Sequence, residues 1–112
     1  MNRKAIFLDC DGTLLDVSRG MNTISEKTKF AIKKLQENGH LVFISSGRCL
    51  PAMPQDIINA NPTGYIAACG AICLANGKEI FSRSFSDCDI EIIKDFCDRN
   101  NGVYMLENQE KI

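Results

Sequence analysis

The chain has 112 residues, of which 45% are hydrophobic, and a formal net charge of −1. A chain of this length buries one modest core and is too short for two full domains. The balanced charge offers no basic footprint, so neither nucleic acid nor an anionic membrane is expected as a partner. No apolar run reaches transmembrane length and the first residues do not resemble a signal peptide, so a cytoplasmic location is predicted.

The most informative segment is residues 9–13 (DCDGT), which follow the apolar run of residues 5–8. Such a run ended by a glycine turn is typical of a buried strand, and open parallel sheets bind ligands where their strands end. Side chains alternate along an extended segment, so Asp9 and Asp11 point one way and Cys10 points the other. Two neighbouring carboxylates repel each other and favour a bound cation, for which Mg²⁺ is the natural candidate.

These residues are suited to phosphoryl transfer. One carboxylate can attack phosphorus as a nucleophile while the other gives and takes protons. Gly12 allows a sharp turn that brings N–H groups towards an anion, and Thr13 adds a hydroxyl donor. A calcium loop of the EF-hand type is excluded, because its twelfth position requires Glu and here is Gly20.

The next elements predict a strand, helix and strand unit. Residues 14–23 form a loop that can fold over the site as a flap. Ser25 is a candidate N-cap of a helix that Asn38-Gly39 ends, and residues 41–45 form the second apolar strand. A right-handed crossover places Ser46 near Asp9, where its hydroxyl and the following N–H can hold phosphate. Arg48 has three candidate partners, namely substrate, a carboxylate such as Asp16, and solvent.

Further elements alternate to the end of the chain. A short helix begins near Pro51 or Pro54 and stops at Asn61-Pro62, and a third buried strand covers residues 65–68. Gly70 then lets backbone approach the substrate at the same sheet edge. The remaining predictions are a hairpin turning at Asn76-Gly77, a helix capped by Asp87 and ended by Asn101-Gly102, and a strand over residues 103–106.

The six cysteines contain no Cys-x-x-Cys pair, so reduced, partly buried thiols are expected rather than a disulfide or zinc framework. Cys10 is the exception of interest, because a thiol beside the acids is open to oxidation or to a soft metal. His40, which is the only histidine, precedes the second strand and is assigned a structural role.

Three motifs resemble those of the haloacid dehalogenase-like phosphohydrolases. Residues 9–16 (DCDGTLLD) are similar to the first motif and residues 43–48 (FISSGR) to the second. Residues 69–71 (CGA) resemble the Asn-Gly-Ala step of the Cof-type subgroup with a C2 cap, with Cys69 in place of Asn. The resemblance implies an α/β fold with a Rossmann-like parallel sheet core and a β-hairpin in residues 1–82. It also implies that residues 83–112 begin an incomplete α+β C2 cap.

The same resemblance implies a magnesium-dependent phosphatase of small phosphorylated metabolites that works through an aspartyl-phosphate. Asp9 would be the nucleophile and Asp11 the acid and base, and both would serve the metal, with Asp11 offering a carbonyl. The phosphate or substrate would be bound by Gly12, Thr13, Ser46, Gly47, Arg48 and Gly70. The family's third and fourth motifs, with a Lys and further acids, have no counterpart after Leu106, so the chain is expected to be the first part of a longer enzyme.

Two other interpretations stay open. In one, the chain is a catalytically silent fragment that binds phosphate or metal weakly, or self-associates through its exposed cap strand. In the other, it is a receiver-type phosphoacceptor domain. The receiver type fits less well, because the chain has no evident Lys on a late strand.

Overall fold

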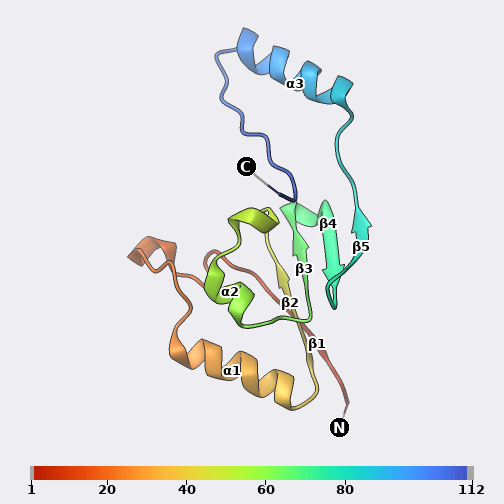
Figure 1. Ribbon diagram of the computed structural model, residues 1–112. Coiled ribbons are helices and arrows are strands. Elements are labelled where there is room, and N and C mark those ends of the chain that lie inside the picture. The colour runs from red at the N-terminus through yellow and green to blue at the C-terminus, as the bar shows by residue number, and fades with distance from the viewer. Residues whose placement is uncertain (1, 111–112) are drawn as a thin grey trace.

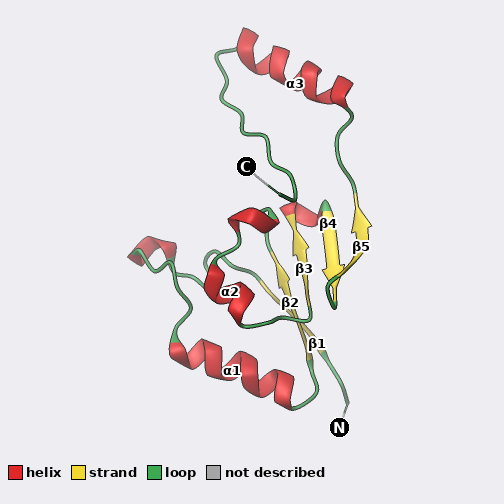
Figure 2. Ribbon diagram, viewed as in Figure 1, coloured by secondary structure: helices red, strands yellow, loops and turns green. Residues whose placement is uncertain are grey.

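The computed structural model describes residues 2–110 and contains one five-stranded sheet with helices (Figures 1 and 2). Three short 3-10 turns, η1 to η3, interrupt its loops. The strands and helices are β1 (Ala5–Leu8), α1 (Glu26–Glu37), β2 (Leu41–Ser45), α2 (Gln55–Asn59), β3 (Gly64–Ala67), β4 (Ile72–Ala75), β5 (Lys78–Ser82) and α3 (Asp87–Arg99), and the turns are η1 (Val17–Arg19), η2 (Leu50–Ala52) and η3 (Ala68–Gly70).

The sheet order is β1-β2-β3-β4-β5. The first three strands pair in parallel, while β4 and β5 are antiparallel and form the predicted hairpin at Asn76-Gly77. Each parallel pair is joined through a helix, as right-handed crossovers require. The carboxyl ends of β1, β2 and β3 therefore meet at one edge of the sheet (Figure 1). This arrangement confirms the predicted α/β fold with a largely parallel core.

The hydrophobic core lies between one face of the sheet and helices α1 and α2. Val42 and Ile44 of β2 point into it, as do Ile32 of α1 and Ile57 of α2. Burying a side chain of this size contributes roughly 1.5–3 kcal/mol. Leu15 is also buried, so the start of the loop after β1 is fixed to the core. This packing holds the strand ends in register.

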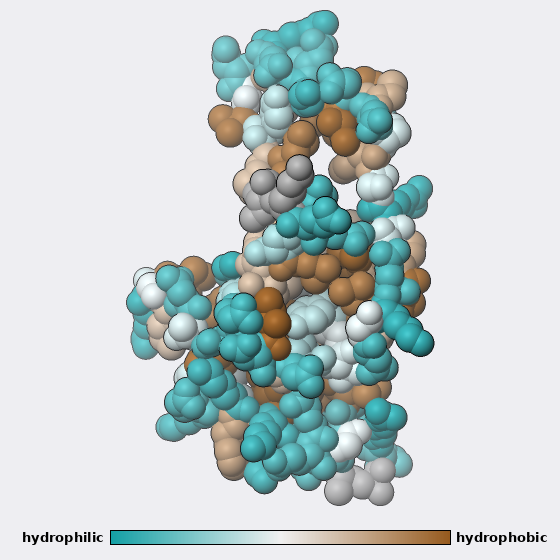
Figure 3. Space-filling model, viewed as in Figure 1, coloured by the Kyte–Doolittle hydropathy of each residue, from teal (hydrophilic) through white to brown (hydrophobic). Residues whose placement is uncertain are grey.

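The other face of the sheet carries a stacked aromatic pair. The rings of Phe7 and Phe43 lie 5.2 Å apart between centroids, and Phe7 is 57% exposed. The space-filling view shows further hydrophobic side chains at the surface, over the middle of the molecule and beside α3 (Figure 3).

Helix α3 begins one residue earlier than the sequence indicated. Its N-cap is Ser86, whose hydroxyl accepts the Asp89 N–H at 3.1 Å while the Asp89 carboxylate accepts the Ser86 N–H at 3.3 Å. The prediction of Asp87 as the cap is therefore wrong. Asp87 lies in the first turn, where its charge favours the helix dipole. The cap of α1 is Ser25, as predicted.

Two strand predictions need correction. Residues 103–106 form no strand: they follow α3 as an extended segment apart from the sheet, and Val103 is 98% exposed. A strand requires a hydrogen-bonded neighbour, and the described residues place none beside this segment. The third strand is Gly64–Ala67 rather than 65–68, because Ala68 already has a φ of 48°. The division at residues 82 and 83 stays a prediction.

Among residues 2–110, no helix is both long enough and apolar enough to cross a bilayer. His40 has the structural role assigned to it, since its Nδ1 accepts the Lys4 N–H at 3.3 Å across the start of β1 and β2.

Replacing Gly64 with alanine is expected to lower the free energy of unfolding by about 3 kcal/mol or more. A Cβ atom at Gly64 would lie 2.0 Å from the main-chain oxygen of Leu74 in β4, so the pairing of β3 with β4 must open. Urea denaturation measures the loss. Gly20→Ala is the control, because a Cβ atom there meets no other atom and the substitution costs only the strain of a left-handed backbone, about 1–2 kcal/mol. An equal loss in both variants would contradict the close approach of β4 to Gly64.

Candidate active site

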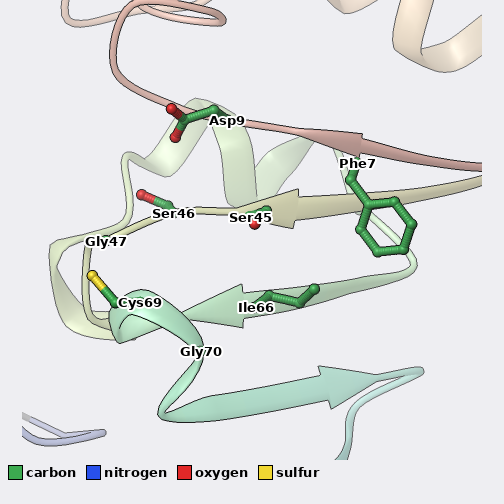
Figure 4. Close-up of a pocket in the computed structure, with 8 residues that line it drawn as sticks. All are labelled: Phe7, Asp9, Ser45, Ser46, Gly47, Ile66, Cys69 and Gly70. Atoms are coloured by element: carbon green, nitrogen blue, oxygen red, sulfur yellow. The ribbon is translucent and has the colours of Figure 1, made fainter.

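A cavity of about 520 Å³ lies at the carboxyl ends of the parallel strands (Figure 4). Figure 4 shows the Asp9 carboxylate just beyond β1 and the Ser46 hydroxyl just beyond β2. The crossover through α1 brings these two side chains to the same edge. The cavity is lined by Phe7, Asp9, Ser45, Ser46, Gly47, Ile66, Cys69 and Gly70.

Asp9 is exposed, and its Oδ1 atom accepts the Cys10 N–H at 2.7 Å. That hydrogen bond sets the direction of the carboxylate towards the cavity. Cys10 points the opposite way, as the alternation predicts, and is fully buried with its Sγ 3.6 Å from Met53 Sδ. Burial raises the pKa of the Cys10 thiol. Since oxidation requires an accessible thiolate, Cys10 is not the oxidation site that its place in the sequence suggested.

Ser46 is the buried polar side chain of the cavity, with 7% of its surface exposed. Its Oγ accepts the Arg48 N–H at 3.1 Å, and its own N–H donates to the Ile66 oxygen at 2.9 Å. The side chain is thus held in place from β3 and from its own loop. The Ser46 hydroxyl also interacts with the Cys10 thiol, where it opposes the effect of burial on the thiol pKa. A hydroxyl proton rotates between acceptors, so Ser46 can donate to an anion in the cavity instead.

Arg48 binds Asp11 through two parallel hydrogen bonds. Its Nε lies 2.9 Å from Asp11 Oδ2 and its Nη2 lies 2.8 Å from Asp11 Oδ1, while Nη1 donates to the Ala52 oxygen at 3.0 Å. The hydrogen bonds from Arg48 lower the pKa of Asp11, and the bonds to Asp11 raise the pKa of Arg48. The guanidinium therefore contacts a carboxylate, but this is Asp11 rather than Asp16. Neither Arg48 nor Asp11 lines the cavity, so of the two neighbouring acids Asp9 alone borders it.

Gly12 and Thr13 also lie outside the cavity lining. Gly12 has a φ of 81°, which supports the predicted sharp turn. Its N–H, however, donates to the Leu15 oxygen at 2.8 Å, and the Thr13 N–H donates to the Cys10 oxygen at 3.3 Å. Both amides close the turn itself and do not point to an anion site. The predicted role of the Thr13 hydroxyl as a donor stays a prediction.

The oxygen donors at the site suit a hard cation only in part. Asp9 presents a carboxylate to the cavity, whereas both Asp11 carboxylate oxygens accept from Arg48. Residues 2–110 hold no cluster of three His, Cys, Asp or Glu side chains fit for a metal. Mg²⁺ commonly keeps several waters and takes one or two carboxylates, so Asp9 with a main-chain oxygen is a compatible but weak donor set.

Arg48→Gln is expected to raise the pKa of Asp11 towards its ordinary value, since the two charge-assisted hydrogen bonds are lost. A lowered folded-state pKa gives stability above the unfolded-state pKa that is lost as pH falls through the folded value. The variant should therefore lose stability near neutral pH and be less sensitive to acid. NMR titration of the Asp11 carboxyl carbon measures the shift, with Arg19→Gln as the control. An unchanged Asp11 titration would contradict the pairing.

Four residues of the lining were not expected from the sequence as site residues: Phe7, Ser45, Ile66 and Cys69. Phe7 lies two positions before Asp9, and the period of two along a strand places both on the same face. The period of two could therefore have identified Phe7 as a site residue. Cys69 directly precedes Gly70, but its approach to Gly47 depends on a turn that the sequence does not specify.

A carboxylate and a buried serine hydroxyl at the carboxyl edge of a parallel sheet are suited to binding and attacking a phosphate ester in an α/β enzyme. A model of the family described as haloacid dehalogenase-like hydrolase matches residues 6–112. The chain belongs to this family, as the three motifs predicted.

Particular relatives support the assignment. The chain is 46% identical over 48 residues to the protein named "Putative phosphatase YkrA" of Bacillus subtilis, covering 43% of the chain and 18% of that protein. It is similar to the structure of BT1666 from Bacteroides thetaiotaomicron, a HAD superfamily phosphatase, with 26% identity, a TM-score of 0.74, and 88% and 36% of the two chains covered. It is also similar to the structure of TM0651 from Thermotoga maritima, with 29% identity and a TM-score of 0.67, over 90% of this chain and 37% of that one. The chain thus spans well under half the length of these relatives.

Proposed function

We propose that this chain carries the nucleophile and the phosphate anchor of a magnesium-dependent phosphatase that acts on small phosphorylated metabolites. The observation that carries the proposal is the shared cavity of Asp9 and Ser46. A phosphate in this cavity has an oxygen nucleophile on one side and a buried hydroxyl donor on the other. Family membership supports the reaction class.

The chemistry proceeds in two steps on the chain's own residues. An Asp9 carboxylate oxygen attacks phosphorus, the P–O bond to the ester oxygen breaks, and that oxygen takes a proton from Asp11. A water then attacks phosphorus of the aspartyl-phosphate and gives its proton to Asp11, which releases phosphate and restores Asp9. Ser46 donates a hydrogen bond to a phosphoryl oxygen throughout.

Arg48 has a positioning role in this proposal. Its paired hydrogen bonds favour the carboxylate form of Asp11, which is the form that accepts a proton from water. Before Asp11 can protonate the leaving ester oxygen it must take up a proton from water, and this requires its hydrogen bonds to Arg48 to loosen. In this proposal Arg48 acts through Asp11 and does not make the direct contact with substrate in the cavity that was expected from the sequence.

Mg²⁺ would be held by the Asp9 carboxylate and the main-chain oxygen of Asp11, and when bound it neutralises charge on the phosphoryl oxygens. With so few protein donors, weak binding is expected of this chain. Gly47 and Gly70 border the cavity without side chains, so they leave room for substrate.

The test is phosphate release from phenyl phosphate by the 112-residue chain, with Mg²⁺ or with a chelator present. Release that requires Mg²⁺ supports the proposal. No release above the chelated control would contradict activity of this chain and would favour the alternative, in which it binds phosphate without turnover.

Exposed apolar side chains favour a second property, which is self-association. Phe85, Ile92, Phe96 and Met105 are each more than half exposed. Apolar surface of this extent is typical of an interface. Light scattering after size-exclusion chromatography is expected to show dimers or larger species, and Phe96→Ser should shift the population towards monomer, whereas Lys33→Ser should not. A clean monomer at high concentration would contradict this expectation.

A further inference from the structure

The turn after β3 has an unusual backbone. Ala68, Cys69 and Gly70 have φ values of 48°, 56° and 93°, so three successive residues are left-handed. Residues with a Cβ rarely adopt this region unless surrounding contacts hold them there. Here the Ala68 N–H donates to the Arg48 oxygen at 2.8 Å and the Cys69 N–H donates to the Ser46 oxygen at 3.2 Å. The turn is therefore bound to both ends of the loop that carries Ser46.

This backbone places the Cys69 side chain against the phosphate-binding loop. A Cβ atom built on Gly47 would lie 3.2 Å from Cys69 Sγ. Figure 4 shows the sulfur pointing towards Gly47, with Asp9 on the far side of Ser46. Cys69 is exposed although the cavity lining includes it. Its thiol thus stands where the cavity opens to solvent.

We propose that Cys69 is a specificity-determining residue, which forms the wall of the cavity opposite Asp9 and contacts the ester group attached to the substrate phosphate. The inference rests on the proposed function. With phosphate held between Asp9 and Ser46, an ester group that extends over Gly47 meets the Cys69 thiol. A thiol is a weak hydrogen-bond donor, so its effect is chiefly steric. Cys69 therefore limits the bulk of the ester group next to phosphorus.

The chain contains a matched control for this proposal. Cys69 and Cys88 are the exposed cysteines of the described residues, and Cys88 lies on α3, outside the cavity. Alkylation by iodoacetamide, followed by peptide mass spectrometry, gives the two rates in one sample. Phenylphosphonate serves as the probe, because its P–C bond prevents turnover. Its binding in the presence of Mg²⁺ is measured separately by ³¹P NMR.

Phenylphosphonate is expected to slow alkylation of Cys69 several-fold and leave Cys88 unchanged, and inorganic phosphate is expected to protect Cys69 less. Phenylphosphonate that binds without slowing Cys69 alkylation would overturn the inference and leave the proposed function standing. Absence of binding by both anions would overturn the proposed function and the inference together.

Variants at Cys69 give a second readout. Cys69→Ser nearly keeps the size of the side chain and serves as the near-isosteric comparison for a larger substitution at the same position. Cys69→Met adds bulk and should weaken phenylphosphonate several-fold more than phosphate, provided that circular dichroism shows the fold intact. Equal effects on the two anions would contradict a steric wall. If Cys69→Met does not fold, the alkylation experiment alone decides.

Discussion

Asp9→Asn is expected to lower the rate of magnesium-dependent phosphate release at least about 1,000-fold, a loss of the size seen when a nucleophile is removed. The amide keeps the shape of the carboxylate and can still fill its place at the end of β1, but it is a poor nucleophile and a weaker partner for a cation. The rate of phosphate release from phenyl phosphate, at saturating Mg²⁺, is the measurement.

Asp16→Asn is the matched control for this variant. Asp16 lies in the loop after the same strand, hydrogen-bonds Ser18 and pairs with Arg19, and does not line the cavity. Its activity should stay close to that of the unaltered chain. Equal rates for Asp9→Asn and the unaltered chain would show that another group performs the attack.

Ser46→Ala is expected to lower the rate of phosphate release about 100-fold, the loss found when one donor to a developing oxyanion is removed. The substitution also leaves the Arg48 N–H without the acceptor that it has at 3.1 Å. The phosphate-binding loop should therefore be less well positioned. Steady-state kinetics measure the change, and a fall in kcat beyond any rise in KM would place the contact in the transition state.

Ser45→Ala serves as the comparison for Ser46→Ala, because Ser45 lines the same cavity but is the last residue of β2, whereas Ser46 follows the strand. Its effect on the rate should be under about tenfold, well below that of losing an oxyanion donor. If the two serine variants lose activity equally, Ser46 is not the anchor and the loss reflects the shape of the cavity alone.

The strand ends that build the site could be predicted because periodicity and crossover handedness depend on local sequence. The apolar runs before Asp9 and Ser46 indicated parallel strands, and the helix between them brought both residues to one edge. The expectation that the first of these strands is buried was wrong, because β1 lies at the edge of the sheet and none of its residues is buried. The position of Arg48 was less predictable. A long side chain has several partners within reach. The conformation of the folded loop determines that the Arg48 guanidinium reaches the Asp11 carboxylate.

Local ambiguity explains the remaining differences. Ser86 and Asp87 are both good caps, and the reciprocal bonds with Asp89 select Ser86. The apolar pattern of residues 103–106 suits a strand, but strand formation depends on a neighbour that periodicity does not reveal. The left-handed turn at Cys69 depends on hydrogen bonds to a loop some twenty positions away in the sequence, so no local pattern predicts it.

The proposed covalent bond between Asp9 and phosphorus can be detected by acid-quenched peptide mass spectrometry. The chain is mixed with phenyl phosphate and Mg²⁺, quenched within the first turnover, and digested. A phosphoryl group is expected on the peptide that contains Asp9, and none is expected on that peptide in Asp9→Asn. Phosphate release with the phosphoryl group on another peptide, or with no phosphorylated peptide at any quench time, would contradict the proposed bond.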